Sequence, residues 1–138
     1  MKRFVFSLFA AVVLLFPSFV LAQEANSSDK VVDTKFMLVV SSLVASMVFD
    51  VETSFAGIKK HPEINTREGN PVMKLFVNAG RPATYALLSG AEAGLVSISY
   101  WMKKSKKPAI RKIWWAVPVV GTTSHAIGGG VNLRFVFR

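Results

Sequence analysis

The chain has 138 residues, enough for one domain, and 51% of them are hydrophobic. The apolar residues lie in long blocks and not at amphipathic spacing, which predicts membrane spans and argues against a water-soluble core. Seventeen Lys and Arg against eight Asp and Glu give a net charge of +9. These basic residues flank apolar blocks, which predicts contact with the bilayer and its anionic headgroups and argues against nucleic-acid binding. The sequence has no cysteine, which excludes disulfides, thiolate metal sites and cysteine nucleophiles.

The first 22 residues have the form of a secretory signal peptide. Lys2 and Arg3 precede an apolar stretch that ends at Pro17, and Val20-Leu21-Ala22 suits a cleavage site before Gln23. The same segment is long enough to be an uncleaved anchor helix. We favour cleavage because a signal peptidase site requires the break and the Val-x-Ala ending. Together with the later spans, this predicts a protein of the bacterial inner (cytoplasmic) membrane.

Residues 23–35 are polar and predict a flexible or N-capping lead-in. Three long apolar blocks follow and predict membrane spans at residues 36–58, 82–102 and 113–131. A helix rises 1.5 Å per residue, so about 20 residues cross the hydrocarbon layer of a bilayer. Pro82 suits the start of the second span, because a proline there loses no helical hydrogen bond. The sequence therefore predicts an all-α fold: a small transmembrane helical bundle over residues 36–131, with three mature spans.

Two shorter stretches do not predict spans. Residues 72–80 are too few to cross a bilayer and include Lys74, so we expect an interfacial or re-entrant half-helix. Residues 132–138 alternate apolar and polar side chains, as strands of outer-membrane barrels do. One strand cannot make a barrel, so we predict an interfacial tail. Gly128, Gly129 and Gly130, just before this tail, predict local unwinding of the last turn.

Each span has a face of small and polar residues when residues are placed 100° apart. The first span gathers Ser42, Ser46, Asp50, Thr53 and Gly57. The third span gathers Pro118, Gly121, His125, Gly128 and Asn132. The second span has two such faces: one with the GxxxG pair Gly90 and Gly94, the other with Tyr85, Glu92 and Ser99. Because small residues let helices approach closely, we expect these faces to pack, the GxxxG face either inside the bundle or between copies.

Glu92 is the most informative residue, because it lies in the middle of a span that is otherwise uncharged. A charge there costs a few kcal/mol unless it is paired, protonated or in contact with water. We predict a polar intramembrane cluster of Asp50, Thr53, Glu92 and His125. We expect Tyr85 and Ser99 to support Glu92, and Glu52, on the opposite side of the first span from Asp50, to reach the headgroup region.

Three interpretations of this cluster stay open. The side chains hydrogen-bond one another and fix the packing of the helices, or they exchange protons or cations as in a carrier or sensor. The third is a metal site, but no HxxxH or ExxH spacing supports one, so we predict no metal and no cofactor. No GxSxG or HExxH motif indicates an enzyme. Our main expectation is a non-enzymatic membrane protein that acts through helix packing with itself or with membrane partners, and the carrier or sensor is the alternative.

A basic cluster follows the second span: Lys103, Lys104, Lys106, Lys107, Arg111 and Lys112. Such a cluster sets membrane topology and attracts anionic headgroups by about 1 kcal/mol per residue. Signal cleavage with simple alternation of spans places it outside, whereas basic loops are typically cytoplasmic. The orientation of the chain therefore stays open.

The pattern Asp50-x-x-Thr53 followed by Glu68-x-Asn70-Pro71 resembles that of an uncharacterised group of small bacterial inner-membrane proteins. Members of that group carry Asp-x-x-Thr-Thr at the end of one helix and Glu-x-Asn-Pro in the next loop. Here Ser54 stands in place of the second threonine. The resemblance covers about residues 46–131 and implies one polar cluster of Asp50, Thr53, Glu68 and Asn70 at a membrane edge, without implying an activity.

Overall fold

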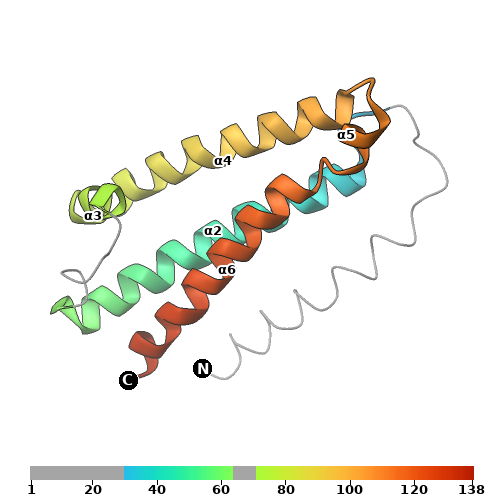
Figure 1. Ribbon diagram of the computed structural model, residues 1–138. Helices are drawn as coiled ribbons and strands as arrows, with labels where there is room; N and C mark the ends of the chain where they lie inside the picture. The colour runs from blue at the N-terminus through green and yellow to red at the C-terminus, as the bar shows by residue number, and fades with distance from the viewer. Residues whose placement is uncertain (1–29, 64–70) are drawn as a thin grey trace. The chain divides into compact units, whose positions relative to one another are not determined.

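The computed structural model describes residues 30–63 and 71–138, so the expected signal peptide lies outside the described residues. The chain divides into two units, Met1–Leu38 and Val39–Arg138. All the described elements are helices, which confirms the predicted all-helical class (Figure 1). They are α2 (Thr34–Lys60), α3 (Pro71–Asn78), α4 (Arg81–Lys104), α5 (Pro108–Lys112) and α6 (Ala116–Phe137).

The start of α2 lies in the first unit and is capped by Asp33. The backbone N–H of Phe36 donates to Asp33 Oδ1 at 2.8 Å, which satisfies a donor that has no partner within the helix. This confirms an N-capping role within the predicted lead-in.

A sharp turn at Gly80 separates α3 from α4. Gly80 has a φ of 95°, a conformation that glycine adopts without the strain of a Cβ. Pro82 lies in the first turn of α4, as predicted, where its missing N–H removes no hydrogen bond. The residues 72–80 therefore do form a short helix and its C-terminal turn, and α4 starts as a separate helix.

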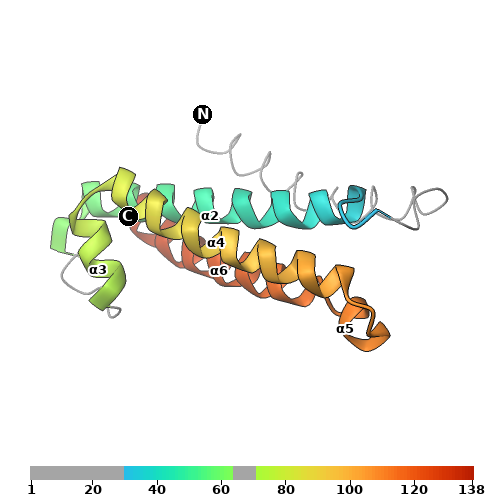
Figure 2. The same ribbon diagram turned by 90° about the horizontal axis from the view of Figure 1, so that it is seen from above.

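Within the second unit, α2, α4 and α6 lie side by side, and α5 connects the end of α4 to the start of α6 (Figures 1 and 2). The helices α2 and α6 run parallel, because contacting residues keep a constant difference of 78 in residue number. The contacting pairs are Leu43 and Gly121, Asp50 and Gly128, Ser54 and Asn132, and Gly57 and Phe135. The helix α4 runs antiparallel to α6, since Glu92 contacts His125 and Lys103 lies over the ring of Trp114.

Complementary side-chain sizes bring α2 and α6 close together. A Cβ added to Gly121 would lie 2.7 Å from Leu43 Cδ1, and one added to Gly128 would lie 2.8 Å from Asp50 Oδ1. Seven residues further along, α2 supplies the glycine and α6 the large side chain: a Cβ on Gly57 would lie 3.3 Å from the Cβ of Phe135. The predicted packing faces of the first and third spans therefore meet each other, and glycine is required for the approach.

The C-terminal residues correct two predictions. The three consecutive glycines at 128–130 do not unwind, and residues 132–137 continue α6 instead of forming an interfacial tail. The contacts of Asn132 with Ser54 and of Phe135 with Gly57 explain this, because they continue the α6–α2 interface beyond the glycines. Packing outweighs the weak helix propensity of glycine here.

Among the described helices, only α2 is both long and apolar enough to cross a membrane by length and composition. The helices α4 and α6, with 24 and 22 residues, have the length to cross a bilayer. Their glycines, hydroxyl residues and ionisable groups lower their hydropathy.

Candidate functional site: a carboxylate–imidazole triad

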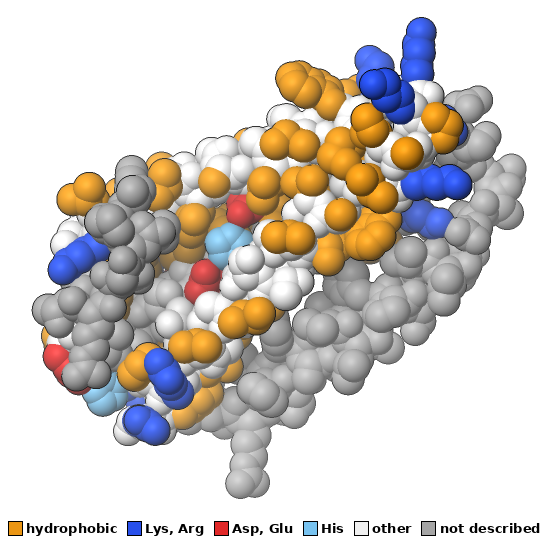
Figure 3. All heavy atoms as spheres, viewed as in Figure 1, with side chains coloured by type: hydrophobic (Ala, Val, Ile, Leu, Met, Phe, Trp, Pro, Cys, Tyr) orange, Lys and Arg blue, Asp and Glu red, His pale blue; other side chains and the backbone are white. Residues whose placement is uncertain are grey.

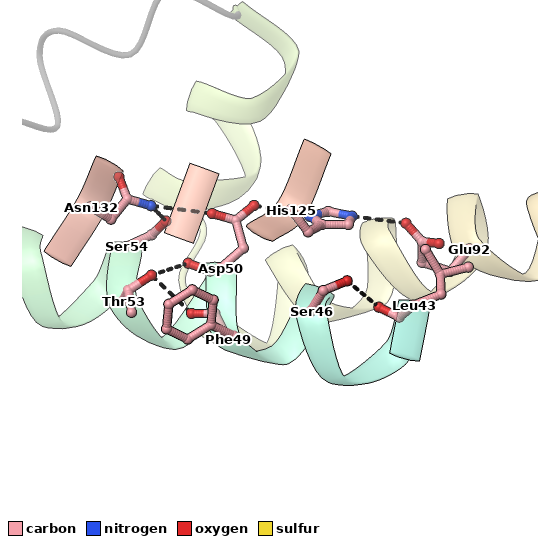
Figure 4. Close-up of polar contacts among 9 residues, drawn as sticks. All are labelled: Leu43, Ser46, Phe49, Asp50, Thr53, Ser54, Glu92, His125 and Asn132. Carbon is pink, nitrogen blue, oxygen red and sulfur yellow. Dashed lines mark hydrogen bonds and ion pairs between the residues drawn. The ribbon is translucent and has the colours of Figure 1, made fainter. Parts of the chain in front are cut away.

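Asp50, His125 and Glu92 form one hydrogen-bonded chain, which we call the central triad (Figure 4). Nδ1 of His125 lies 2.9 Å from Asp50 Oδ2, and Nε2 of the same ring lies 2.9 Å from Glu92 Oε1. Each residue comes from a different helix: Asp50 from α2, Glu92 from α4 and His125 from α6. The imidazole therefore joins two carboxyl groups and couples all three long helices.

The geometry of the triad fixes how many hydrogens it holds. Two hydrogen bonds need two hydrogens, whether both are on the imidazole or one is on a carboxyl group. Two carboxylates and a neutral imidazole have only one such hydrogen among them. A further hydrogen on the imidazole or on a carboxyl group would therefore satisfy both contacts at once.

The second oxygen of Glu92 sets this residue apart. Oε2 is buried and has no hydrogen-bond partner among the described residues. It lies near Gly121, where an added Cβ would be 3.7 Å away. A buried polar atom without a hydrogen-bond partner is costly, which sets this oxygen apart from the paired Oε1.

Asn132 and Ser54 extend the chain beyond Asp50. The Asn132 side-chain amide donates to Asp50 Oδ1 at 3.2 Å and to Ser54 Oγ at 2.7 Å. The sequence predicts Asn132 on the same face of the third span as His125, but the predicted cluster does not include it. Ser54 stands out in the sequence only because it replaces the second threonine of the Asp-x-x-Thr-Thr motif. Helical spacing could have identified both residues. Asn132 lies seven residues, or about two turns, after His125, and Ser54 lies four residues, or about one turn, after Asp50.

Thr53, in contrast, does not join the side-chain cluster. Its hydroxyl donates to the backbone carbonyls of Phe49, at 2.8 Å, and Asp50, at 3.1 Å. The Ser46 hydroxyl likewise donates to the Leu43 carbonyl within its own helix. Ser46 and Thr53 are buried, and Ser42 is half-buried, so the predicted face does pack. The hydroxyls of Ser46 and Thr53 therefore form their hydrogen bonds within α2 and not across the interface with another helix.

The expected partners of Glu92 were wrong in part. His125 is its partner, as predicted, but the Ser99 hydroxyl donates to the Leu95 carbonyl and the Tyr85 hydroxyl donates to Glu52 Oε1 at 3.0 Å. Glu52 also pairs with Arg81 at 3.5 Å. Glu52 therefore faces the start of α4 and links two helices. Its expected place in the headgroup region stays a prediction.

The GxxxG pair does not pack inside the bundle. A Cβ added to Gly90 or Gly94 would meet no described residue within 4 Å, and both residues are exposed. Ala86, Ala93 and Ser97 on the same side of α4 are exposed as well. Of the two alternatives for this face, contact between copies remains as a prediction.

The basic cluster lies at the end of the bundle where α4, α5 and α6 meet. Lys103 lies 4.5 Å from the ring of Trp114, and the other five basic residues are exposed. Glu68 and Asn70 lie outside the described residues, and for Pro71 the structure describes only its place at the start of α3. The loop half of the resemblance is therefore not tested.

No group of three His, Asp or Glu residues in residues 30–63 and 71–138 is arranged to hold a metal ion. In the central triad each imidazole nitrogen already has a carboxyl partner. No protein-family model, curated protein or solved structure matches this chain.

Proposed function

We propose that this chain is a small integral membrane protein of the bacterial inner membrane, with three crossings formed by α2, α4 and α6. The support is the distribution of residue types. The described residues bury polar and charged side chains (Ser46, Thr53, Thr84, Glu92 and Ser99) as often as large apolar ones (Phe36, Leu43, Met47, Val51 and Trp114). Soluble domains seldom do so, because their cores are mostly apolar.

The outward side chains support the same proposal. Large hydrophobic residues are exposed along all three long helices, among them Val44, Val48, Ile98, Trp101, Val119, Val120, Ile127 and Val131. Figure 3 shows hydrophobic side chains over much of one face, with Lys and Arg near its two ends. Soluble monomers rarely expose apolar surface on this scale, whereas a bilayer covers it. Extraction at high pH with carbonate tests the proposal: release of the protein into the supernatant would contradict it.

Within this bundle, we propose that the central triad binds and releases a proton, so that the protein acts as a proton-coupled carrier or sensor. One observation carries this proposal: His125 is hydrogen-bonded at both ring nitrogens to carboxyl groups from two other helices. A proton gained or lost at such a site changes the attraction between all three helices at once. Histidine is also the side chain that ordinarily changes charge near neutral pH.

Infrared spectroscopy of the purified protein in detergent tests the proton site. The carboxylic acid band is compared between about pH 5 and about pH 8, the range in which imidazole ordinarily titrates. We expect part of this band to change in the native protein and to be lost in Glu92→Gln. A band that stays constant over this range would mean that the triad only fixes the packing of the helices.

A second proposal concerns association between copies of the chain or with a membrane partner, and it rests on the exposed face of α4. The side of α4 with Gly90 and Gly94 is exposed and made of small residues, the kind of surface along which helices in membranes approach closely. We propose that two copies, or this chain and a membrane partner, associate through it. The double variant Gly90→Ile and Gly94→Ile tests this proposal, because the added side chains should prevent the close approach of two helices.

The basic cluster at the α4–α5–α6 end is proposed to contact anionic headgroups. The aromatic ring of Trp114 beside Lys103, and the exposed Trp115, are typical of a headgroup region. We expect vesicles with anionic lipid to raise the thermal stability of the reconstituted protein. Replacing Lys106 and Lys107 by Gln should reduce that gain, and an unchanged gain would contradict the proposal.

A further inference from the structure

The central triad is not enclosed equally on its two sides. The exposed fraction of the side chain falls along the chain of contacts, from 23% for Asp50 to 13% for His125 and 8% for Glu92. In Figure 3, two acidic side chains on either side of a histidine are visible at the surface between α4 and α6. By exposed fraction, Asp50 is the most accessible member of the triad and Glu92 the least.

The side beyond Asp50 is polar. Asn132 and Ser54 continue the hydrogen-bonded chain in this direction, and the group of Glu52, Tyr85 and Arg81 follows near the start of α4. At the end of α6, the Lys60 ammonium group donates to the Val136 carbonyl. Polar groups thus occur between Asp50 and the end of the bundle where α2 ends, and such groups can hydrogen-bond to water.

The side beyond Glu92 is closed by a tightly packed layer, which we call the apolar plug: Leu43, Gly121 and Leu95. A Cβ on Gly121 would lie 2.7 Å from Leu43 Cδ1 and 3.0 Å from Leu95 Cδ1, so there is no room for water between these residues. Leu43, Pro118 and Ser99 are fully buried. In this direction Glu92 Oε2 meets apolar groups and has no hydrogen-bond partner among the described residues.

The titratable groups of the triad come from all three helices that pack around it: Asp50 from α2, Glu92 from α4 and His125 from α6. Among the other charged groups of α2 and α4, Glu52 and Arg81 pair with each other. Glu52 also accepts a hydrogen bond from the Tyr85 hydroxyl. A proton that reaches Asp50 therefore has a continuous hydrogen-bonded way to Glu92 and no polar group in the apolar plug to take it further.

We propose that water reaches the central triad only from the end of the bundle where α2 ends, and that the triad exchanges protons with one side of the membrane. This inference rests on the proposed membrane bundle and its proton site. It assigns the side of the bundle from which the proton site exchanges in this conformation, for a carrier or a sensor alike. Asp50 is the entry, His125 passes the proton on, and Glu92 is the closed end.

Single cysteines test this access directly, because the native chain has none. A thiol reacts with a maleimide as its thiolate, which requires contact with water. Three positions are compared in sealed vesicles with a membrane-impermeant maleimide. Ser54→Cys reports on the polar side, Ser99→Cys on the packed side near the apolar plug, and Val120→Cys on the exposed apolar surface of α6.

We expect Ser54→Cys to react at least about 10-fold faster than Ser99→Cys and Val120→Cys, since neither of these two contacts water. The reaction should occur in vesicles of one orientation and not in those of the other. Asn132→Cys serves as a second reporter on the polar side in case Ser54→Cys folds poorly. Circular dichroism establishes folding for each variant.

The results distinguish a failure of the proposed membrane bundle from a failure of one-sided water access. If Val120→Cys reacts as fast as Ser54→Cys, α6 is not in a bilayer, and the proposed membrane bundle fails together with the inference. If neither Val120→Cys nor the two polar-side reporters, Ser54→Cys and Asn132→Cys, react with the maleimide, the membrane bundle is retained and one-sided water access is wrong. Rapid reaction of Ser99→Cys, or labelling of Ser54→Cys in both vesicle orientations, would also overturn it.

Discussion

Asp50 of α2 lies directly against the backbone of Gly128 of α6. A Cβ at this glycine would be 2.8 Å from Asp50 Oδ1, closer than real Cβ contacts allow. The same carboxyl group accepts a hydrogen bond from Asn132 and is 2.9 Å from the His125 ring. The absence of a side chain at position 128 therefore sets the position of the whole triad.

The first prediction follows from this contact. Gly128→Ala should displace Asp50 and cost about 1–3 kcal/mol of stability, the range for overpacked interiors. Gly130→Ala is a matched control in the same helix, because a Cβ there meets nothing within 4 Å. It should stabilise the helix by up to about 1 kcal/mol, since alanine is the better helix former. Thermal unfolding in detergent measures both, and equal effects would contradict the proposed role of Gly128.

The second prediction concerns Glu92. Glu92→Gln keeps a hydrogen bond to His125 Nε2, so its stability should change by less than about 1 kcal/mol. Glu92→Leu leaves that nitrogen without its partner and should cost about 1–3 kcal/mol. Thermal unfolding and expression level give the comparison. If neither substitution alters stability or cellular phenotype, Glu92 is neither a proton site nor required for the fold.

The third prediction compares Asn132 with Thr53. Asn132→Leu removes the donor to both Asp50 and Ser54 and should cost about 1–2 kcal/mol, because two part-buried acceptors each lose a hydrogen bond. Thr53→Val removes a hydroxyl that bonds only to carbonyls of its own helix, so the change should stay below about 1 kcal/mol. Denaturant or thermal unfolding distinguishes them, and a larger loss for Thr53→Val would show that the cluster predicted from sequence was the correct one.

The fourth prediction tests assembly through α4. The double variant Gly90→Ile and Gly94→Ile should leave the monomer folded, since both positions face open space, but should abolish association between copies by steric overlap. Gly130→Ile, an equally open glycine on α6, is the control and should not alter assembly. Cross-linking in membranes and size-exclusion chromatography in mild detergent measure the result. Unchanged association of the double variant would rule out this face.

The helices and their packing faces could be predicted from sequence, because helical periodicity depends only on local spacing. The faces of Ser46 and Asp50, and of Gly121 and His125, were placed correctly. Which face meets which depends on contacts between distant residues, and there the prediction was weaker. Tyr85 was assigned to Glu92 but reaches Glu52, since both glutamates are within range of α4 and spacing along one helix cannot choose between them.

The C-terminal tail shows a second limit. Alternation at residues 132–138 gave the wrong period, because the pattern is too short to separate a strand from a helix end. The glycines before it weaken a helix in isolation. Only the contacts of Asn132 and Phe135 with α2 explain why α6 continues to Phe137, and these contacts join residues that are 78 positions apart.

The parallel course of α2 and α6 also determines how the chain can be mapped in a cell. In the proposed membrane bundle, α4 runs opposite to both, so the ends of α2 and α6 would face one compartment and α5 with its basic residues the other. Each connecting segment is thereby tied to the location of the C-terminus. A single reporter fused after Arg138 would therefore assign a compartment to every one of them, and with it the side from which the proposed proton site exchanges.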